Sequence, residues 1–193
     1  MHSDPFEEWG ADPDFERLGW HLRAELRAEA EEYERLAAVD ALRGRRLGDV
    51  ALELLHRGDV VAVDLAGRSF TGAVVYTAGD LLCVRGAGSV VDVNLEAPLS
   101  LRVVERVRRG GAGRSGGPPG FKARLFEHEA GGGTVTLGTR LVVGELSGRI
   151  DAVAVDHVLL LDADGAPWHV ALTAVDFVRR PRQPARPPHP QAR

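Results

Sequence analysis

Two stretches of the chain share one pattern of apolar and polar positions. Residues 60–84 and 135–161 each contain an apolar run, a turn, a Ser/Thr-Gly step, and a second apolar run that one Asp interrupts. Short runs of alternating apolar and polar residues between turn residues predict β-strands. The separation between Gly72 and Gly148, the glycines of the two steps, is too long for a solenoid repeat and suits a small domain plus a linker. We therefore predict two copies of one small β module.

Each module is predicted to begin with a short helix and to continue as five short strands. The first module covers 48–107, and its helix is expected to run from Asp49, a good N-cap, to about His56. The second covers 121–180. Strongly curved strands need a residue without Cβ where the backbone bends. We assign structural roles, at the bends and in the turns before the third strands, to Gly72, Gly148, Asp80 and Asp156.

A helical periodicity precedes the modules. Apolar residues recur at steps of three and four along the otherwise charged segment 12–44, which predicts an amphipathic helix with Pro13 at its first helical position. Two roles for the apolar stripe stay open: it covers the β modules, or it self-associates. The stripe consists of Phe15, Leu18, Leu22, Leu26, Tyr33 and Leu36.

Three other segments carry no such pattern. Residues 1–11 and the Pro/Arg-rich tail 181–193 are expected to be disordered. Residues 108–120 are rich in Gly, Pro and Arg and are expected to form a flexible linker.

Composition narrows the cellular setting. The chain is 44% hydrophobic and 27% charged, with a net charge of −4. No apolar run approaches the ~20 residues of a membrane span, and the acidic first segment lacks the basic start and apolar core of a signal peptide. Cys83 is the single cysteine, so no internal disulfide can form, and its place between two apolar residues predicts a buried, inert thiol. We expect a cytoplasmic protein without membrane contact.

The stretch GDVVAVDLAGRSFTGAVVYTAGDLLCV resembles the first half of the Sm-like small β-barrel. The likeness consists of an apolar strand, a turn with Gly67-Arg68, the aromatic Phe70, the bend at Gly72, and a third strand after a polar turn. The whole chain also resembles a group of uncharacterised actinobacterial proteins with an acidic helix and two such modules. The resemblance implies a mainly β fold with an N-terminal helix and two tandem Sm-like or SH3-like small β-barrels. It implies no established activity.

The RNA site of the Sm-like family does not transfer with the fold. RNA-binding members place an Asn in the turn before the third strand and an Arg-Gly pair before the last strand. Here Asp80 and Asp156 occupy the turns, and no Arg-Gly pair stands before either last strand. An Asp repels phosphate and cannot stack a base, so we expect no uridine-binding site.

Arginines outside the strands offer another route to nucleic acid. Such residues neutralise backbone phosphates, although their segments lack the aromatic residues that stack bases, apart from Phe121. The candidates are Arg106, Arg108, Arg109, Arg114, Arg179, Arg180 and Arg182.

No catalytic or metal constellation accompanies these features. The histidines lack metal-ligand spacing, and no Ser, His and Asp arrangement has a recognisable nucleophile context. The sequence therefore favours a non-enzymatic binding or scaffolding protein that acts by β-edge or helix contacts, with an unidentified protein partner or a second copy of itself. The alternative is a nucleic-acid-binding regulator, and the third and least favoured is an enzyme of unknown reaction. We expect no cofactor and see no sign of a small-molecule ligand.

Overall fold

The computed structural model describes residues 13–107, 110–111, 116–141 and 143–180. The predicted disordered segments 1–11 and 181–193 lie outside these ranges. Two compact units are distinguished, Met1–Arg45 and Arg46–Arg193. The first contains the helix α1 (Pro13–Arg43), which confirms the expected N-terminal helix.

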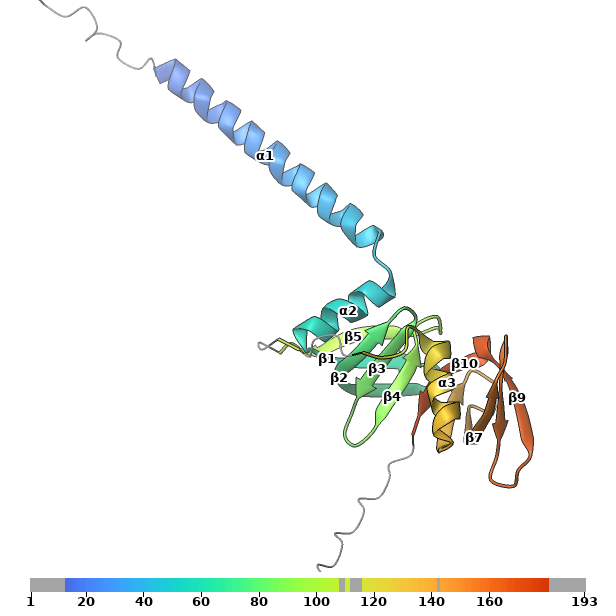
Figure 1. Cartoon of the computed structure of the whole chain (residues 1–193). Coiled ribbons are helices and arrows are strands. Elements are labelled where there is room, and N and C mark those ends of the chain that lie inside the picture. The colour runs from blue at the N-terminus through green and yellow to red at the C-terminus, as the bar shows by residue number, and fades with distance from the viewer. Residues whose placement is uncertain (1–12, 108–109, 112–115, 142, 181–193) are drawn as a thin grey trace, which may run out of the picture. The chain divides into compact units, whose positions relative to one another are not determined.

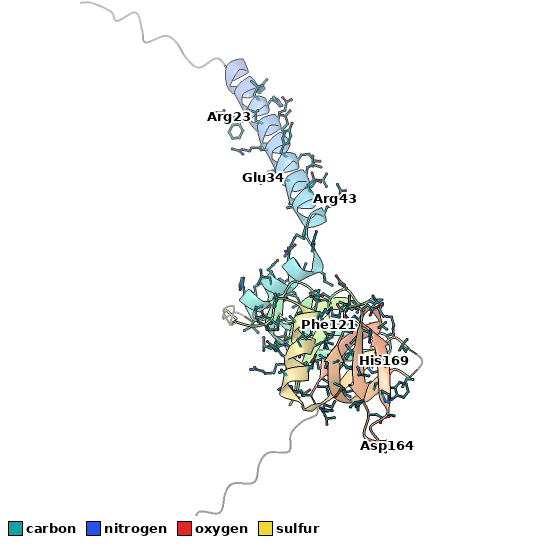
Figure 2. All side chains as sticks on the ribbon, turned by 45° about the vertical axis from the view of Figure 1, so that its right-hand side comes forward. Arg23, Glu34, Arg43, Phe121, Asp164 and His169 are labelled. Carbon is teal, nitrogen blue, oxygen red and sulfur yellow. The ribbon has the colours of Figure 1, made fainter. Side chains whose placement is uncertain are left out.

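Helix α1, taken by itself, is charged along most of its length. Arg23, Glu34 and Arg43 project from it in Figure 2. Four of the six stripe residues have described side chains, and all four are solvent-exposed; Phe15 and Leu18 lie outside the described side chains. No helix in the described ranges is both long and apolar enough to cross a membrane.

The second unit is mainly β, as expected (Figure 1). Its first part consists of α2 (Leu47–Arg57), β1 (Val60–Leu65), β2 (Arg68–Ala78), β3 (Leu81–Arg85), β4 (Val90–Asn94) and β5 (Ser100–Glu105). Its second part consists of α3 (Phe121–Gly131), β6 (Thr134–Thr139), β7 (Glu145–Val153), β8 (His157–Leu161), β9 (Pro167–Ala171), the short 3-10 helix Leu172–Ala174 and β10 (Val175–Arg179).

The strands form one open antiparallel sheet in the order β5-β1-β2-β3-β4-β10-β6-β7-β8-β9. The first strand set (β1–β5) and the second strand set (β6–β10) have the same internal order, and the pairing of β4 with β10 joins them. The expected pair of separate barrels is therefore not confirmed. Neither set closes on itself, because the edge strand β4 of the first set pairs with the edge strand β10 of the second.

The registers of the two sets match in detail. Val61 pairs with Gly72, and Val135 pairs with Gly148. A bulge follows at the same distance from each glycine, between Val74 and Tyr76 in β2 and between Ile150 and Ala152 in β7. These registers let each residue of one set be assigned a counterpart in the other.

Gly72 and Gly148 lie where a neighbouring strand leaves no room for a side chain. A Cβ at Gly72 would be 2.2 Å from the carbonyl oxygen of Arg85, and a Cβ at Gly148 would be 2.1 Å from that of Leu161. Arg85 and Leu161 are themselves counterparts. Both glycines thus permit the same close backbone approach at the bend.

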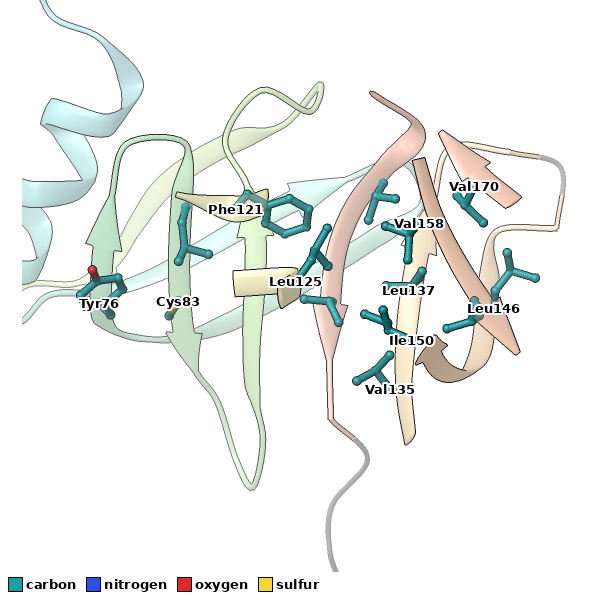
Figure 3. Close-up of a cluster of buried hydrophobic side chains, with 14 of the residues drawn as sticks. Tyr76, Cys83, Phe121, Leu125, Val135, Leu137, Leu146, Ile150, Val158 and Val170 are labelled. Carbon is teal, nitrogen blue, oxygen red and sulfur yellow. The ribbon is translucent and has the colours of Figure 1, made fainter. Parts of the chain in front are cut away.

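Two hydrophobic cores extend across the β4–β10 pairing. One core unites α3 with buried residues of both strand sets, and Figure 3 shows Phe121 and Leu125 of α3 between Cys83 on β3 and Leu137 on β6. The other core contains α2 and the first strand set together with Phe177 of β10. Phe177 packs against Phe70 with a ring separation of 4.8 Å. The two sets are therefore packed as one body.

The start of α2 differs from the prediction. The helix begins at Leu47, and Asp49 is its third residue instead of its N-cap. The Asp49 carboxylate accepts a hydrogen bond from the Arg46 amide (2.8 Å), so it caps the helix by reaching backward. Gly58 in the left-handed conformation (φ 72°) ends α2.

The described ends of the predicted linker pack against the first strand set. The Gly111 amide donates to the His56 carbonyl (2.8 Å), and the Tyr76 hydroxyl donates to the carbonyl of buried Pro118 (2.9 Å). A Cβ at Gly117 would be 2.7 Å from the Tyr76 ring. These described ends of the predicted linker therefore contact the fold, and glycine at position 117 allows the close approach.

Candidate functional site at the joint between the strand sets

The joint consists of the β4–β10 pairing and the side chains around it. Val91, Asp92 and Val93 of β4 pair with Arg179, Val178 and Phe177 of β10, respectively. At the end of β4, the Asn94 side-chain amide donates to the Val175 carbonyl (3.1 Å). A short antiparallel ladder and one side-chain hydrogen bond therefore fix the register.

Asp80, which the sequence assigns to a structural turn, supports the joint from the first set. Its carboxylate accepts a hydrogen bond from the Phe121 amide at the start of α3 (2.7 Å). An acidic group at a helix N-terminus satisfies a free N–H and complements the helix dipole. A turn in one half thus anchors the helix of the other half.

Asp156, the counterpart of Asp80, caps no helix. Its side chain is 85% exposed and contacts the ring of His157 (2.8 Å). The hydrogen bond with His157 lowers the pKa of Asp156 below its ordinary value. The residue before it, Val155, is 89% exposed. The turn that contains Asp156 is therefore exposed to solvent, whereas the equivalent turn with Asp80 contacts α3 at the joint.

A buried polar chain crosses the joint. His128 on α3 is 4% exposed, and its Nε2 lies 3.0 Å from Oδ2 of buried Asp92 on β4. On the other side of the ring, Nε of Arg180 donates to Nδ1 of His128 (3.2 Å). Since Nδ1 accepts, the ring proton is assigned to Nε2, which donates to Asp92. Both ring nitrogens of His128 are thereby engaged in hydrogen bonds.

Arg124 and Cys83 complete this cluster. Arg124 lies 3.6 Å from both Asp92 Oδ1 and Cys83 Sγ, and 2.6 Å from Glu127. Burial alone would raise the pKa of Asp92, but hydrogen bonds from His128 and Cys83 and the charge of Arg124 outweigh burial and lower it. Burial, with the nearby Asp92 charge, raises the pKa of Cys83 well above its ordinary value. The thiol is 1% exposed, as expected for an inert cysteine.

A cavity of about 770 Å³ opens beside this cluster. Asp92, Arg124, His128 and Arg180 line it, together with residues of two glycine-containing loops. The first is the β3–β4 turn, with Gly88 and Ser89, and the second is the α3–β6 connection, where Gly133 lies between Gly131 at the end of α3 and Thr134 at the start of β6.

The two edge strands of the sheet, β5 and β9, occupy the same positions in their strand sets as the two strands of the joint, β10 and β4. β5 pairs only with β1, and β9 pairs only with β8 among the described strands. β5 is the counterpart of β10, and β9 is the counterpart of β4. Trp168 and His169 are exposed on β9, the outer strand on which Figure 2 labels His169. On β5, Val103 and Val104 are 38% and 49% exposed.

The proposed nucleic-acid arginines are not brought together among the described residues. Arg106 is exposed after β5, Arg179 pairs with Glu145 (3.0 Å), and Arg180 binds His128. Three described members are thus dispersed, and two of them are engaged in the fold. The other four lie outside the described residues: Arg108, Arg109, Arg114 and Arg182.

The Asp92–His128–Arg180 chain carried no signal in the sequence. Its members are far apart along the chain, and His128 stands without a metal or catalytic spacing. No group of His, Cys, Asp and Glu able to hold a metal ion occurs within the described ranges. Comparison with models of known protein families and with curated proteins gives no match, so neither comparison assigns the chain to a family.

Proposed function

We propose that this chain is a non-enzymatic assembly protein, built as a tandem of one Sm-like β module, whose copies associate by pairing β9 of one copy with β5 of the next. One observation carries the proposal. The internal joint pairs β4 with β10, and the counterparts of these two strands are the edges left without a partner. An unpaired edge strand is a template for another strand. The chain would use between copies the same joint that it uses within itself.

The internal register predicts which residues meet between copies. Arg102 is the counterpart of Arg179, because Arg102 pairs with Ala62 and Arg179 with Thr136. By the same alignment, Trp168 is the counterpart of Val91. Since Val91 faces Arg179 in the joint, Trp168 of one copy faces Arg102 of the next. Leu101 then faces His169, and Ser100 faces Val170.

The exposed turn of the second strand set supports the same arrangement. Asp80 caps Phe121, and the counterpart of Phe121 on the first helix is Leu47. Asp156 of one copy would therefore approach the start of α2 in the next copy. Arg46 directly precedes Leu47, so a carboxylate would meet both a helix N-terminus and a positive charge.

Such pairing is head to tail, because β9 and β5 are different surfaces. A head-to-tail interface closes into a ring if its rotation permits and otherwise extends as a filament. In either case every copy offers both edges, and the mass in solution is a multiple of the 20.8 kDa chain.

Disulfide trapping tests the register directly. Residues opposite each other in an antiparallel ladder have Cα atoms about 4.5–5.5 Å apart, which is within the range that a disulfide spans. A chain with Arg102→Cys and Trp168→Cys should form a ladder of covalent oligomers on mild oxidation. The native Cys83 is buried and should not contribute.

The matched control moves one cysteine by a single position. A chain with Arg102→Cys and His169→Cys carries the same number of thiols, but a shift of one residue turns the side chain to the opposite face of the sheet. It should give few oligomers. Equal ladders from the two variants, or a wild-type chain that stays a single copy at all concentrations in light scattering, would refute the proposal.

The nucleic-acid alternative predicts a different outcome. Filter binding at about 150 mM salt should then show micromolar or tighter, sequence-dependent binding of RNA or DNA. Replacing Arg106, Arg108, Arg109 and Arg114 with Ser should weaken it and reduce its salt dependence. The assembly proposal expects only generic polyanion attraction.

A further inference from the structure

The cavity at the joint has the size of a small-molecule site. Its volume of about 770 Å³ lies within the range of known ligand pockets. The Asp92–His128–Arg180 chain lines the cavity, together with residues of both strand sets. A ligand there would contact both halves of the second unit at once.

Arg180 is the cation of this cavity that remains available. Arg124 is held by Glu127 and Asp92. Arg180 uses only Nε, toward His128, and forms no ion pair with a carboxylate among the described residues. His128 thus orients the guanidinium, and no described residue accepts a hydrogen bond from its two Nη groups, the pair of donors that binds an oxyanion in bidentate fashion.

The polar cluster has no equivalent at the free β5 edge of the first half. The counterparts of His128, Arg124 and Arg180 in the first half are Leu54, Val50 and Val103. All three are apolar; Leu54 is buried, and Val103 is 38% exposed on the edge strand β5. Burial of charged groups costs free energy unless they are well paired, and apolar replacements of similar volume are often neutral or stabilising. The charges at this one place therefore point to a role beyond packing.

We infer that this cavity binds a small molecule through a phosphoryl group, which Arg180 holds. Ser89 and Thr134 line the same cavity, and a hydroxyl group of this kind can donate to further oxygens. Glycines in both loops allow close approach of backbone to the ligand. A phosphoryl group accepts more hydrogen bonds than a carboxylate, which suits this set of donors. The site is independent of the free edges.

Calorimetric titration of the full chain with inorganic phosphate and with pyrophosphate tests the inference, at constant ionic strength set with sodium chloride. The wild-type chain should bind at least one of the two saturably. Arg180→Gln should weaken binding about tenfold or more, since a hydrogen bond to a charged group is lost. Arg179→Gln is the matched control. It removes the neighbouring arginine, which pairs with Glu145 and does not line the cavity, and it should bind as wild type.

A second measurement covers the case in which Arg180→Gln does not fold. In amide NMR spectra of the wild-type chain, pyrophosphate should shift signals of the two loops around Ser89 and Thr134. Arg180→Lys keeps the charge but loses the bidentate fork, and it should bind with intermediate affinity. Three outcomes would each overturn the inference: no saturable binding of either anion, equal loss in the Arg179 and Arg180 variants, or shifts located away from these two loops.

Discussion

Replacing the bend glycines by alanine should destabilise the second unit by a similar amount at both positions. A Cβ at Gly72 would lie 2.2 Å from the Arg85 carbonyl oxygen, and one at Gly148 would lie 2.1 Å from that of Leu161. Relief to 3.0 Å requires the strands to separate by about 0.8 Å. The obstacle is backbone, which cannot rotate away as a side chain can. Overpacking of this kind costs about 2–3 kcal/mol, and valine in place of alanine should cost more.

Thermal unfolding followed by circular dichroism measures the effect. A loss of that size lowers the melting temperature by roughly 4–12 °C in a unit of this size. Gly133→Ala is the control, because a Cβ there meets no atom within 4 Å and the backbone is not left-handed. Melting temperatures unchanged in both bend variants would refute the steric argument. A large loss at one glycine and none at the other would refute the equivalence of the two strand sets.

Three further predictions concern the polar cluster, the thiol and the N-terminal helix. Asp92 has a lowered pKa in the folded chain, so its contribution to stability is present above about pH 4 and is lost as pH falls through the folded pKa. Asp92→Asn should therefore lower the free energy of unfolding by about 3 kcal/mol at neutral pH, and this free energy should then fall less as the pH is lowered. Urea melts from pH 7 to pH 3 measure it. If the free energy of unfolding changes equally with pH in wild type and variant, the prediction is wrong. Cys83 should react with a thiol reagent only on unfolding, because it is buried and its pKa is raised; rapid labelling of the native chain would show that β3 is accessible. Removal of residues 1–45 should leave a folded β unit with unchanged disulfide trapping, since the two units are separate. If the trapped ladder disappears, helix α1 and not the β edges drives assembly.

The sequence alone was sufficient for the local structure. The helical spacing of apolar residues predicted α1, and the alternating runs between Gly-containing turns predicted most strands of the second unit. The equivalent positions of Gly72 and Gly148 were also readable, because each follows a Ser or Thr and is the single glycine of its strand, β2 or β7. These features depend on residues that are close together along the chain, so the sequence is enough to predict them.

The partner of each strand edge was decided only by tertiary structure. Sequence periodicity indicates that β4 and β10 are strands, but not that they pair with each other, because hydrogen bonds between strands use backbone groups common to every residue. The two separate barrels were expected from the resemblance to Sm-like modules, and the structure does not confirm them. In the structure the edge strand β4 of the first set pairs with the edge strand β10 of the second.

The candidate site also required the fold. Asp92, His128 and Arg180 come from β4, α3 and the end of β10, and they meet only because α3 lies across the joint. Asp80 was predicted as a turn residue and lies between β2 and β3, but its hydrogen bond with the Phe121 amide depends on the same packing. The sequence specifies which side chains are present. Contacts between distant segments form only when residues of both strand sets pack into the same apolar core. Here both cores extend across the β4–β10 pairing, and this shared burial brings the charged groups together.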